Sequence, residues 1–353
     1  MALKLGLNLG YWGIGPQGEE AVEAVRVAER AGFDSVWAAE SYGSDVVSVL
    51  AWLAAQTETI QLGAAIMQVP ARPPAAAAMA GCTIDALSGG RFIFGFGPSG
   101  PQVSEGWYGV PYAKPWGRTR EYVEIVRQIV AREGRLEYDG QHFKLPLPGG
   151  EGKALKLNFH PVRNRIPIFV GAIGRKSVEM AAEICDGWIP IFSSPDAFES
   201  TWGEHIEAGL AKGSRSRSEL EVSPTVQVAI DGDLDAARSI VKAGLLLYLG
   251  GMGSRKTNFY VDLTHRFGFG EVADEVQSLY LDGKREDAYN AIPDELVNAT
   301  ALIGSEEEVA ERLDRYASAG VDRLIVSPIN PETEQRRHTV ERLAALVGAA
   351  SPA

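Results

Sequence analysis

Apolar residues in this chain fall into short runs that are separated by longer amphipathic segments. Eight runs have the length and the composition of buried strands, namely Leu3–Leu9, Ser35–Ala38, Gln61–Met67, Phe92–Phe96, Ile168–Val170, Trp188–Ile191, Val222–Ile230 and Arg323–Val326. The segments between them have the apolar periodicity of a helix face; examples are Glu19–Ala31, Val46–Thr57, Arg118–Arg132, Lys176–Ile184 and Glu306–Ser318. This alternation predicts stacked βα units around a parallel sheet.

The junctions between helices and strands repeat a common design. Residues 29–36 read ERAGFDSV and residues 317–324 read ASAGVDRL, each with a helix end, a glycine at the C′ position and an aspartate before the strand. Residues 182–189 (AEICDGWI) and 86–93 (ALSGGRFI) are looser copies. Eight alternating units in 353 residues favour a closed (β/α)8 TIM barrel over an open doubly wound sheet.

Residues 1–353 are predicted to form a single domain. Two intervals, about 97–165 and about 231–319, are too long for simple crossovers and are predicted to be insertions. The first holds a helix and a hairpin-like stretch, Leu136–Phe143, with Asp139-Gly140 at its turn. Insertions of this kind usually lie at the carboxyl ends of barrel strands, where they shape the pocket.

Composition and charge narrow the functional classes. The chain is 45% hydrophobic and 23% charged, as soluble globular proteins are. Its net charge of −12 disfavours nucleic acid and membrane surfaces as partners, so we expect a small-molecule substrate. The two isolated cysteines suit a reducing cytoplasm, and the five histidines are scattered without metal-ligand spacing. With no apolar run of membrane-spanning length, we expect a cytoplasmic protein without a metal site.

Residues 166–191, IPIFVGAIGRKSVEMAAEICDGWIPI, carry the strongest chemical signal. An apolar strand stops at Gly171-Ala172-Ile173-Gly174, and a helix opens with Arg175-Lys176-Ser177. A helix start presents free backbone N–H groups and a positive dipole end to an anion. The two basic residues add charge that packing does not need, which favours a phosphate-bearing cofactor over a turn that is tight only for packing.

Gly95-Phe96-Gly97-Pro98-Ser99-Gly100 matches the G-x-G-x-x-G pattern of dinucleotide-binding turns. The context disfavours that interpretation, because Pro101 follows directly and the motif comes after the fourth strand, with no clear βαβ unit and acidic strand end behind it. We interpret the segment as a flat Gly/Ser loop over which a planar ring lies, with the Ser99 hydroxyl at the polar edge of that ring.

Glu40 follows the second predicted strand, where a carboxylate of a barrel points at the active site. Beside a bound ring it would accept a hydrogen bond or act as a general acid or base; the alternative is a solvated loop acid. Asp45, in front of the next helix, fits the role of a helix cap. Aromatic residues near strand ends are candidates for pocket walls: Tyr11, Trp12, Tyr42, Trp107, Tyr108 and Trp116.

Together these segments resemble the luciferase-like superfamily of flavin and deazaflavin enzymes, and within it the coenzyme F420-dependent oxidoreductases, especially an actinobacterial branch. The resemblance covers most of the chain: GLNLGYWG at 6–13, AGFDSVWAAESYGSD at 31–45, LGAAIMQVPARPP at 62–74, LSGGRFIFGFGPSGPQVSEGWYGVPY at 87–112, KPWGRTREYVEIVRQIVARE at 114–133 and IPIFVGAIGRKSVEMAAEICDGWIPIF at 166–192. The combination is specific, although no single stretch is.

The resemblance implies a (β/α)8 barrel with the deazaflavin ring at its carboxyl face, and a homodimer. It implies a non-proline cis peptide between Ala65 and Ile66 at the back of the ring, with Glu40, Ser99 and Gly100 along the cofactor. The residues expected around its phosphate are Gly171, Ala172, Gly174, Arg175, Lys176 and Ser177. The candidates for the anionic oligoglutamate tail are Lys153, Lys156, Arg163 and Arg165.

The chain also departs from some relatives. Ala39-Glu40 stands where some carry an Asp-His pair, and Pro101 follows the Ser99-Gly100 step, which puts sugar-phosphate oxidation in doubt. Methylene-tetrahydromethanopterin reductases often have Gly-Val where this chain has Ala65-Ile66, so that substrate does not follow from the resemblance either.

We therefore expect hydride transfer between C5 of F420 and a small organic substrate, either a carbonyl, an imine or an activated alkene. Glu40 is the predicted proton-transfer residue, and Tyr42 is the second candidate. Two alternatives remain. An FMN-dependent monooxygenase would use the same barrel but react with oxygen, whereas a non-catalytic protein would bind F420 without turnover.

Overall fold

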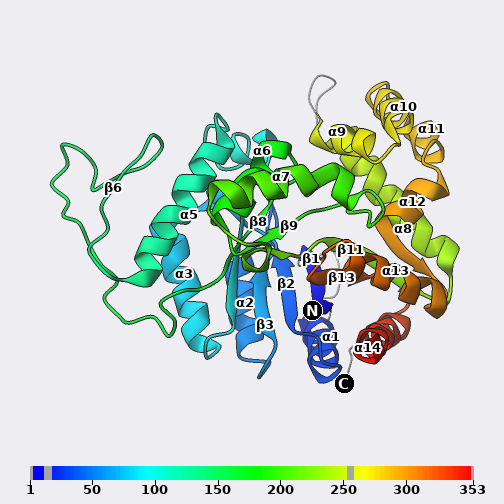
Figure 1. Cartoon of the computed structure of the whole chain (residues 1–353), viewed down its shortest axis with the longest axis horizontal. Helices are drawn as coiled ribbons and strands as arrows, with labels where there is room; N and C mark the ends of the chain where they lie inside the picture. Colours follow the sequence, from blue (N-terminus) through cyan, green and yellow to red (C-terminus); the bar gives the residue numbers. More distant parts are fainter. Residues whose placement is uncertain (1–2, 12–17, 253–257, 351–353) are drawn as a thin grey trace.

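The computed structural model describes residues 3–11, 18–252 and 258–350, and its main feature is one curled sheet (Figure 1). Its strands run in the order β10-β9-β8-β5-β3-β2-β1-β13-β11-β12, and β4 pairs with β5. The bounds are β1 (Lys4–Tyr11), β2 (Ser35–Ala39), β3 (Gln61–Ala64), β4 (Met67–Gln68), β5 (Phe92–Gly97), β8 (Ile168–Gly171), β9 (Gly187–Ile189), β10 (Glu221–Val222), β11 (Thr225–Ile230), β12 (Ala301–Gly304) and β13 (Arg323–Pro328). Every ladder in it is parallel, as predicted.

Helices connect these strands and cover the sheet from outside (Figure 1). Their bounds are α1 (Gly18–Arg30), α2 (Val46–Ala54), α3 (Pro74–Leu87), α4 (Pro101–Ser104), α5 (Pro115–Ala131), α6 (Arg175–Ile184), α7 (Phe198–Lys212), α8 (Leu234–Leu246), α9 (Phe259–Arg266), α10 (Gly270–Leu281), α11 (Arg285–Asn290), α12 (Asp294–Thr300), α13 (Glu306–Ser318) and α14 (Thr333–Ala350). Three short turns complete the set: η1 (Val69–Ala71), η2 (Arg217–Glu219) and the π-helical η3 (Leu247–Gly251). None of the described helices is both long and apolar enough to cross a bilayer.

Most predicted elements are present, with small shifts at their ends. The predicted helix Glu306–Ser318 coincides with α13, whereas the one predicted at Val46–Thr57 ends earlier, as α2. The hairpin predicted at Leu136–Phe143 is present as β6 (Tyr138–Asp139), which pairs antiparallel with β7 (Lys144–Leu145).

Three strand predictions need correction. The run Gln61–Met67 is divided into β3 and β4, because the chain leaves the ladder at Ala65 and Ile66. The run Val222–Ile230 is divided into β10 and β11 at Ser223-Pro224, where the proline has no N–H group for a ladder. The sequence pattern misses β12, since its four residues follow directly on α12 with no turn between them.

The predicted helix–strand junctions are confirmed at the two clearest copies. Gly32 and Gly320 follow α1 and α13 with φ angles of 91° and 84°, a left-handed conformation that favours glycine. The predicted cap at Asp45 is also present, since its carboxylate accepts a hydrogen bond from the Ser48 N–H at 2.7 Å. Local sequence thus sets where these helices begin and end.

Three apolar clusters fill the described structure. The largest lies between the sheet and its helices, with side chains such as Leu50, Phe94 and Leu324. The second belongs mainly to the second insertion and includes Val276 and Leu296. The smallest consists of strand residues, namely Trp37, Ile93, Phe169, Ile189 and Ile325. Figure 1 shows helices α8 to α12 of this insertion together at one side of the molecule, and the β6–β7 segment extending from the opposite side. The two intervals therefore have different structures: the second builds its own core, whereas in the first α5 packs in the main core and only the residues after α5 form an extended arm.

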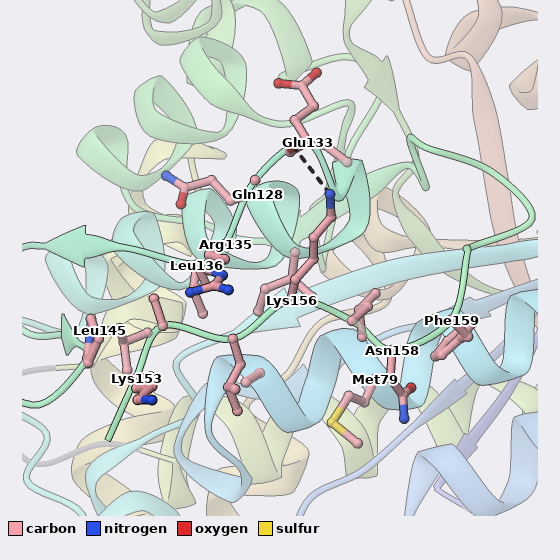
Figure 2. A pocket seen from close by; sticks show the side chains of 18 residues that line it. Met79, Gln128, Glu133, Arg135, Leu136, Leu145, Lys153, Lys156, Asn158 and Phe159 are labelled. Atoms are coloured by element: carbon pink, nitrogen blue, oxygen red, sulfur yellow. Dashed lines mark hydrogen bonds between the residues drawn. The ribbon is translucent and has the colours of Figure 1, made fainter. Parts of the chain in front are cut away.

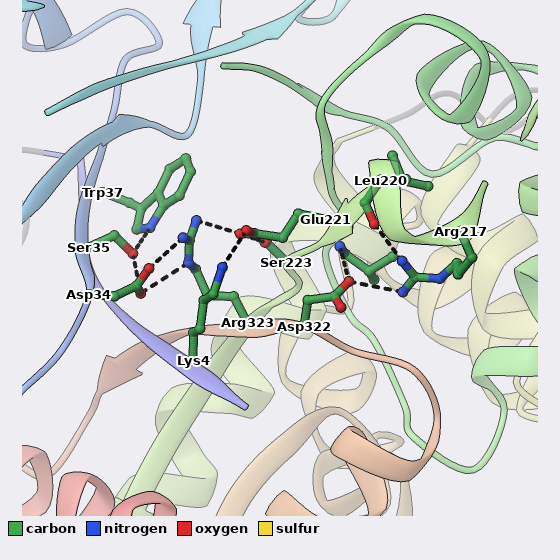
Figure 3. A network of polar contacts seen from close by, with 11 residues as sticks. Lys4, Asp34, Ser35, Trp37, Arg217, Leu220, Glu221, Ser223, Asp322 and Arg323 are labelled. Carbon is green, nitrogen blue, oxygen red and sulfur yellow. Dashed lines mark hydrogen bonds and ion pairs between the residues drawn. The ribbon is translucent and has the colours of Figure 1, made fainter. Parts of the chain in front are cut away.

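The amino edge of the sheet is closed by a buried arginine (Figure 3). Arg323, at the start of β13, is 1% exposed; its Nε donates to Asp34 at 3.1 Å and its NH1 pairs with Glu221 at 2.7 Å. The guanidinium also lies 5.5 Å from the centre of the Trp37 ring. Lys4 Nζ adds a second cation beside Glu221 at 2.9 Å. These contacts join the starts of four strands in one polar cluster.

Replacing Arg323 with methionine should lower the free energy of unfolding by about 3 kcal/mol, because two partly buried carboxylates lose their cation. Urea unfolding measures this change. Arg30→Met is the matched control; it removes an exposed pair with Glu23 and should cost less than about 1 kcal/mol. Equal unfolding midpoints for the two variants would contradict a structural role for the Arg323 cluster.

Candidate functional site

The carboxyl edge of the sheet brings together three segments of chemical interest. The peptide bond between Ala65 and Ile66, after β3, is cis, as the family resemblance implies. A Cβ atom on Gly97 would lie 2.1 Å from the Ile66 Cδ1, and one on Gly171 would lie 3.1 Å from its Cγ2. Ile66 therefore packs on the ends of both β5 and β8. Ile66 thus links the strand end before the Gly/Ser loop with the strand end before the predicted phosphate turn.

The glycines of the G-x-G-x-x-G segment serve close packing at this edge. A Cβ atom on Gly95 would lie 1.8 Å from the carbonyl oxygen of Ala64, which no side chain tolerates. Further on, Ser99 has a φ angle of 63°, and its carbonyl oxygen accepts a hydrogen bond from the Tyr112 hydroxyl at 3.1 Å. The motif therefore has a packing explanation that involves no dinucleotide, and the loop that follows it is fixed in place.

Glu40 is 4% exposed and fully engaged in hydrogen bonds. Its carboxylate pairs with both terminal nitrogens of Arg72, at 2.7 and 2.9 Å. The N–H groups of Gln68 and Val46 donate to the same carboxylate at 2.8 and 3.3 Å, while the Glu40 N–H donates to the Ile66 carbonyl oxygen at 3.4 Å. Burial acts to lower the Arg72 pKa, but the hydrogen bonds and charge of Glu40 outweigh it and raise that pKa. Glu40 thus holds the cis bulge in position.

The predicted phosphate turn has the geometry of an anion-binding helix start. Gly174 has a φ angle of −84° and precedes α6 without a side-chain cap. The indole N–H of Trp188 fixes the turn by donating to the Ala172 carbonyl oxygen at 2.8 Å. Both the hydroxyl and the N–H of Ser177 donate back to the Gly174 carbonyl oxygen, at 2.7 and 3.0 Å. The N–H groups that precede Ser177 in the first turn therefore face outward without helical partners.

Arg266, on α9, was missed by the sequence patterns and joins this turn. Its NH2 donates to the Ile173 carbonyl oxygen at 2.9 Å, while its buried NH1 has no partner among the described residues. Burial, with the neighbouring charge of Arg175, lowers the pKa of Arg266. Arg175 and Lys176 lie exposed beside it. A buried guanidinium nitrogen next to a helix start fits an anionic ligand such as a phosphate.

Two basic residues predicted to hold the cofactor tail lie at the wrong edge. Arg163 pairs with Asp85 and donates to the carbonyl oxygen of Phe92, the first residue of β5. Arg165 pairs with Asp186, which precedes β9. Both arginines precede β8 in the chain and therefore lie at the amino edge of the sheet. The prediction is wrong for them, because their position in a long insertion did not reveal which edge they reach.

The other two candidates, Lys153 and Lys156, lie in the arm at residues 133–165. They line a pocket of about 720 Å³ between the arm, α3 and α5 (Figure 2). Met79 of α3 lines the same pocket. Lys156 Nζ donates to the Glu133 carbonyl oxygen at 3.4 Å. No residue of the phosphate turn lines this pocket. The arm therefore separates these lysines from the surface that fits the cofactor.

The aromatic residues near strand ends have varied positions. Trp12 lies outside the described residues. Tyr42 and Trp107 are 64% and 65% exposed, whereas Trp116 packs against the main core. The Tyr108 hydroxyl donates to a carbonyl oxygen in the loop after β2 at 3.3 Å. Tyr11 ends β1 beside Ala39 of β2, so it lies at the same edge as Glu40.

A curled parallel sheet with a cis bulge and an anion-binding turn at its carboxyl edge is the arrangement expected of luciferase-like flavin and deazaflavin enzymes. The family model for luciferase-like monooxygenases matches residues 9–323, and the chain belongs to this family. The predicted family is thereby confirmed.

Individual relatives agree with this assignment. A Mycobacterium tuberculosis protein, named provisionally as a coenzyme F420-dependent oxidoreductase, is 46% identical over 98% of this chain and 99% of its own length. The 5,10-methylenetetrahydromethanopterin reductase of Archaeoglobus fulgidus is 33% identical over 88% of this chain and 90% of its own. The solved structure of the F420-dependent tetrahydromethanopterin reductase from Methanopyrus kandleri matches with a TM-score of 0.80 and 25% identity, over 98% of both chains.

Replacing Glu40 with glutamine should lower the free energy of unfolding by about 2–3 kcal/mol, because one charged partner of a buried, bidentate pair is lost. Urea unfolding of the ligand-free protein measures this change. Asp45→Asn is the matched control: Asp45 also pairs with Arg72 but is about half exposed, and asparagine retains the helix cap. If Glu40→Gln and Asp45→Asn had the same urea unfolding midpoint, the role of Glu40 in holding the bulge in position would be contradicted.

Proposed function

We propose that this protein is a coenzyme F420-dependent oxidoreductase. One observation carries the proposal: Ile66 packs against two glycine strand ends, beside a helix start where a buried nitrogen of Arg266 has no partner among the described residues. A flat ring fits against the bulge at Ile66, and its phosphate fits the turn. The names of the relatives from three organisms agree with this cofactor and reaction type. The bound deazaflavin would carry a hydride to or from the substrate.

The site residues take distinct roles in this proposal. Ala65 and Ile66 support the back of the ring, while Ser99 and Gly100 lie along it. The residues around the phosphate are Gly171, Ala172, Gly174, Arg175, Lys176 and Ser177, with Arg266 added. Proton transfer by Glu40 or Tyr42 stays a prediction, and the four hydrogen bonds that the Glu40 carboxylate accepts favour a positioning role.

The proposed substrate is a small organic molecule with a carbonyl, imine or activated alkene, since each of these accepts a hydride at carbon. An FMN-dependent monooxygenase is the second candidate, because the family includes luciferase-like monooxygenases and FMN also carries a phosphate. The helix start and Arg266 would bind the phosphate of F420 or of FMN. A preference for one of the two cofactors would therefore come from contacts with its ring.

We also propose that the curled sheet is a closed (β/α)8 barrel within one domain, with insertions at about 97–165 and 231–319. Residues 223–225 bridge the gap between β9 and β13 in the sheet and so support its closure. Ser223 and Thr225 donate to carbonyl oxygens of residues 188 and 190 on one side, while Thr225 pairs with Ile325 of β13 on the other. In this arrangement β12 is an additional strand outside the ring, paired with β11.

We infer a homodimer formed through the arm and α3. The arm exposes Leu147, Leu155 and Val162, which are 74%, 77% and 57% exposed, and α3 exposes Met79 at 56%. Leu155 and Met79 line the same pocket, so these side chains belong to one apolar region. An apolar region of this kind is typical of a surface that a second subunit covers.

A binding titration with oxidised F420 and FMN, side by side, tests the proposed function. We expect micromolar or tighter binding of F420 and weak binding of FMN. Arg266→Met should weaken F420 binding roughly 10-fold or more, because a hydrogen bond to a charged group contributes about 1.5–3 kcal/mol. Arg285→Met is the matched control, since Arg285 lies over the Tyr280 ring elsewhere in the same insertion.

Three outcomes of this titration would count against the proposal. Preference for FMN would assign the protein to the oxygen-using branch of the family. Binding of neither cofactor would contradict the phosphate site. Equal F420 affinity in Arg266→Met and Arg285→Met would remove Arg266 from that site while leaving the cofactor assignment intact.

Light scattering on a sizing column tests the dimer. The wild-type protein should elute at twice the chain mass of 38.0 kDa, and Leu155→Asp should shift it toward the monomer because it places a charge in an apolar interface. Leu281→Asp, an exposed position on α10, serves as the control and should remain dimeric. A monomeric wild-type protein, or a dimer that withstands Leu155→Asp, would contradict this interface.

A further inference from the structure

A pair of tyrosines lies at the carboxyl edge, apart from the residues assigned to the cofactor. Tyr11 ends β1 opposite Ala39, the residue before Glu40. Tyr248 belongs to η3 in the second insertion. The Tyr11 and Tyr248 hydroxyls share a hydrogen bond, which links the end of β1 to the second insertion. The Tyr11 side chain is 38% exposed.

Three aromatic rings form a wall next to this pair. Phe192, Tyr248 and Tyr260 pack edge to face. The ring centre of Phe192 lies 5.0 Å from that of Tyr248 and 6.1 Å from that of Tyr260, and the two tyrosine ring centres are 4.7 Å apart. Phe192 has a φ angle of 53°, a conformation that is unusual for a bulky residue and that occurs often at functional sites. The wall thus comes from two parts of the chain, the end of the sheet and the second insertion. It combines apolar ring surfaces with phenol hydroxyls.

The same wall is adjacent to the predicted cofactor loop. Burial raises the pKa of Tyr260 to about 12, and Tyr11 and Tyr112 make smaller electrostatic contributions to that shift. Tyr112 in turn donates to the carbonyl oxygen of Ser99 at 3.1 Å. The phenols therefore connect the Ser99 loop with the Tyr11–Tyr248 pair. A substrate held against the wall would lie between Tyr11 and a ring that rests on this loop.

The other candidates for the proton donor fit less well. The carboxylate of Glu40 already accepts four hydrogen bonds, two of them from Arg72. Tyr42 is 64% exposed. Tyr11, in contrast, is held by its hydrogen bond with Tyr248 and is partly exposed at the carboxyl edge. Burial raises the pKa of Tyr11 above its usual value, which keeps it protonated at neutral pH.

We propose that Tyr11, positioned by Tyr248, is the proton donor to a neutral carbonyl compound that packs against the wall of Phe192, Tyr248 and Tyr260. This inference rests on the proposed F420-dependent function. In the reducing direction the carbonyl carbon accepts a hydride from the reduced deazaflavin, and the C=O π electrons move to oxygen. The Tyr11 O–H bond breaks to protonate that oxygen, giving an alcohol and the oxidised cofactor. Water then returns a proton to the Tyr11 phenolate.

Cyclohexenone is a suitable probe, since it is neutral and nearly planar and carries the carbonyl, and cyclohexene is the same ring without it. In the protein loaded with oxidised F420, wild type should bind cyclohexenone more tightly than cyclohexene by nuclear magnetic resonance titration. Tyr11→Phe should remove this difference and leave F420 affinity unchanged. With reduced F420, Tyr11→Phe should lower kcat for cyclohexenone about 10²–10⁴-fold, the usual effect of losing a general acid.

Two further variants separate positioning from structure. Tyr248→Phe retains the ring of the wall and should lower kcat about five- to tenfold, with a smaller change in KM, because only the hydrogen bond to Tyr11 is lost. Tyr289→Phe removes a hydroxyl from α11, where it donates to the Ser239 carbonyl oxygen, and should behave as wild type.

The outcomes distinguish this inference from the function on which it rests. Absence of F420 binding to the wild-type protein would overturn both. F420 binding with equal affinity for cyclohexenone and cyclohexene, or without cyclohexenone turnover, would overturn the carbonyl assignment. F420 binding and turnover with Tyr11→Phe matching Tyr289→Phe would overturn the role of Tyr11 alone.

Discussion

Glu40 and Arg72 form a buried, bidentate ion pair beside the break between β3 and β4. Where the chain leaves the ladder at the cis bond, backbone groups need new partners, since unpaired buried N–H groups are costly. Glu40 supplies acceptors for the N–H groups of Gln68 and Val46, and Arg72 balances its charge. The bulge can then present Ile66 to the glycine ends of β5 and β8. The whole proposed site rests on this arrangement.

The two edges of the sheet use buried arginines in opposite ways. At the amino edge, Arg323 has carboxylate partners in Asp34 and Glu221, and the cluster joins strand starts. At the carboxyl edge, Arg266 has only a carbonyl oxygen and an unpaired buried nitrogen among the described residues. Carboxylates of the protein neutralise Arg323, whereas Arg266 has no carboxylate partner among the described residues and can bind an anion. This difference favours the carboxyl edge for the proposed cofactor phosphate.

The second insertion contributes to both halves of the proposed site. It has its own apolar core, so it can hold side chains rigidly above the sheet. Arg266 reaches the phosphate turn from it, and Tyr248 and Tyr260 form most of the aromatic wall. In the proposed site the sheet would supply the surface for the cofactor ring, and the insertion would supply contacts to the substrate.

Sequence by itself determined the parallel βα order, the helix ends at Gly32 and Gly320, the turn at residues 171–177 and, through family resemblance, the cis bond after Ala65. These features depend on neighbouring residues or on a pattern shared by relatives. Only the tertiary structure decided the edge that Arg163 and Arg165 reach, the ion pair that occupies Glu40, and the approach of Arg266 and Tyr248 to the sheet. Those contacts join residues far apart in the chain, and no local pattern encodes the path of a long insertion.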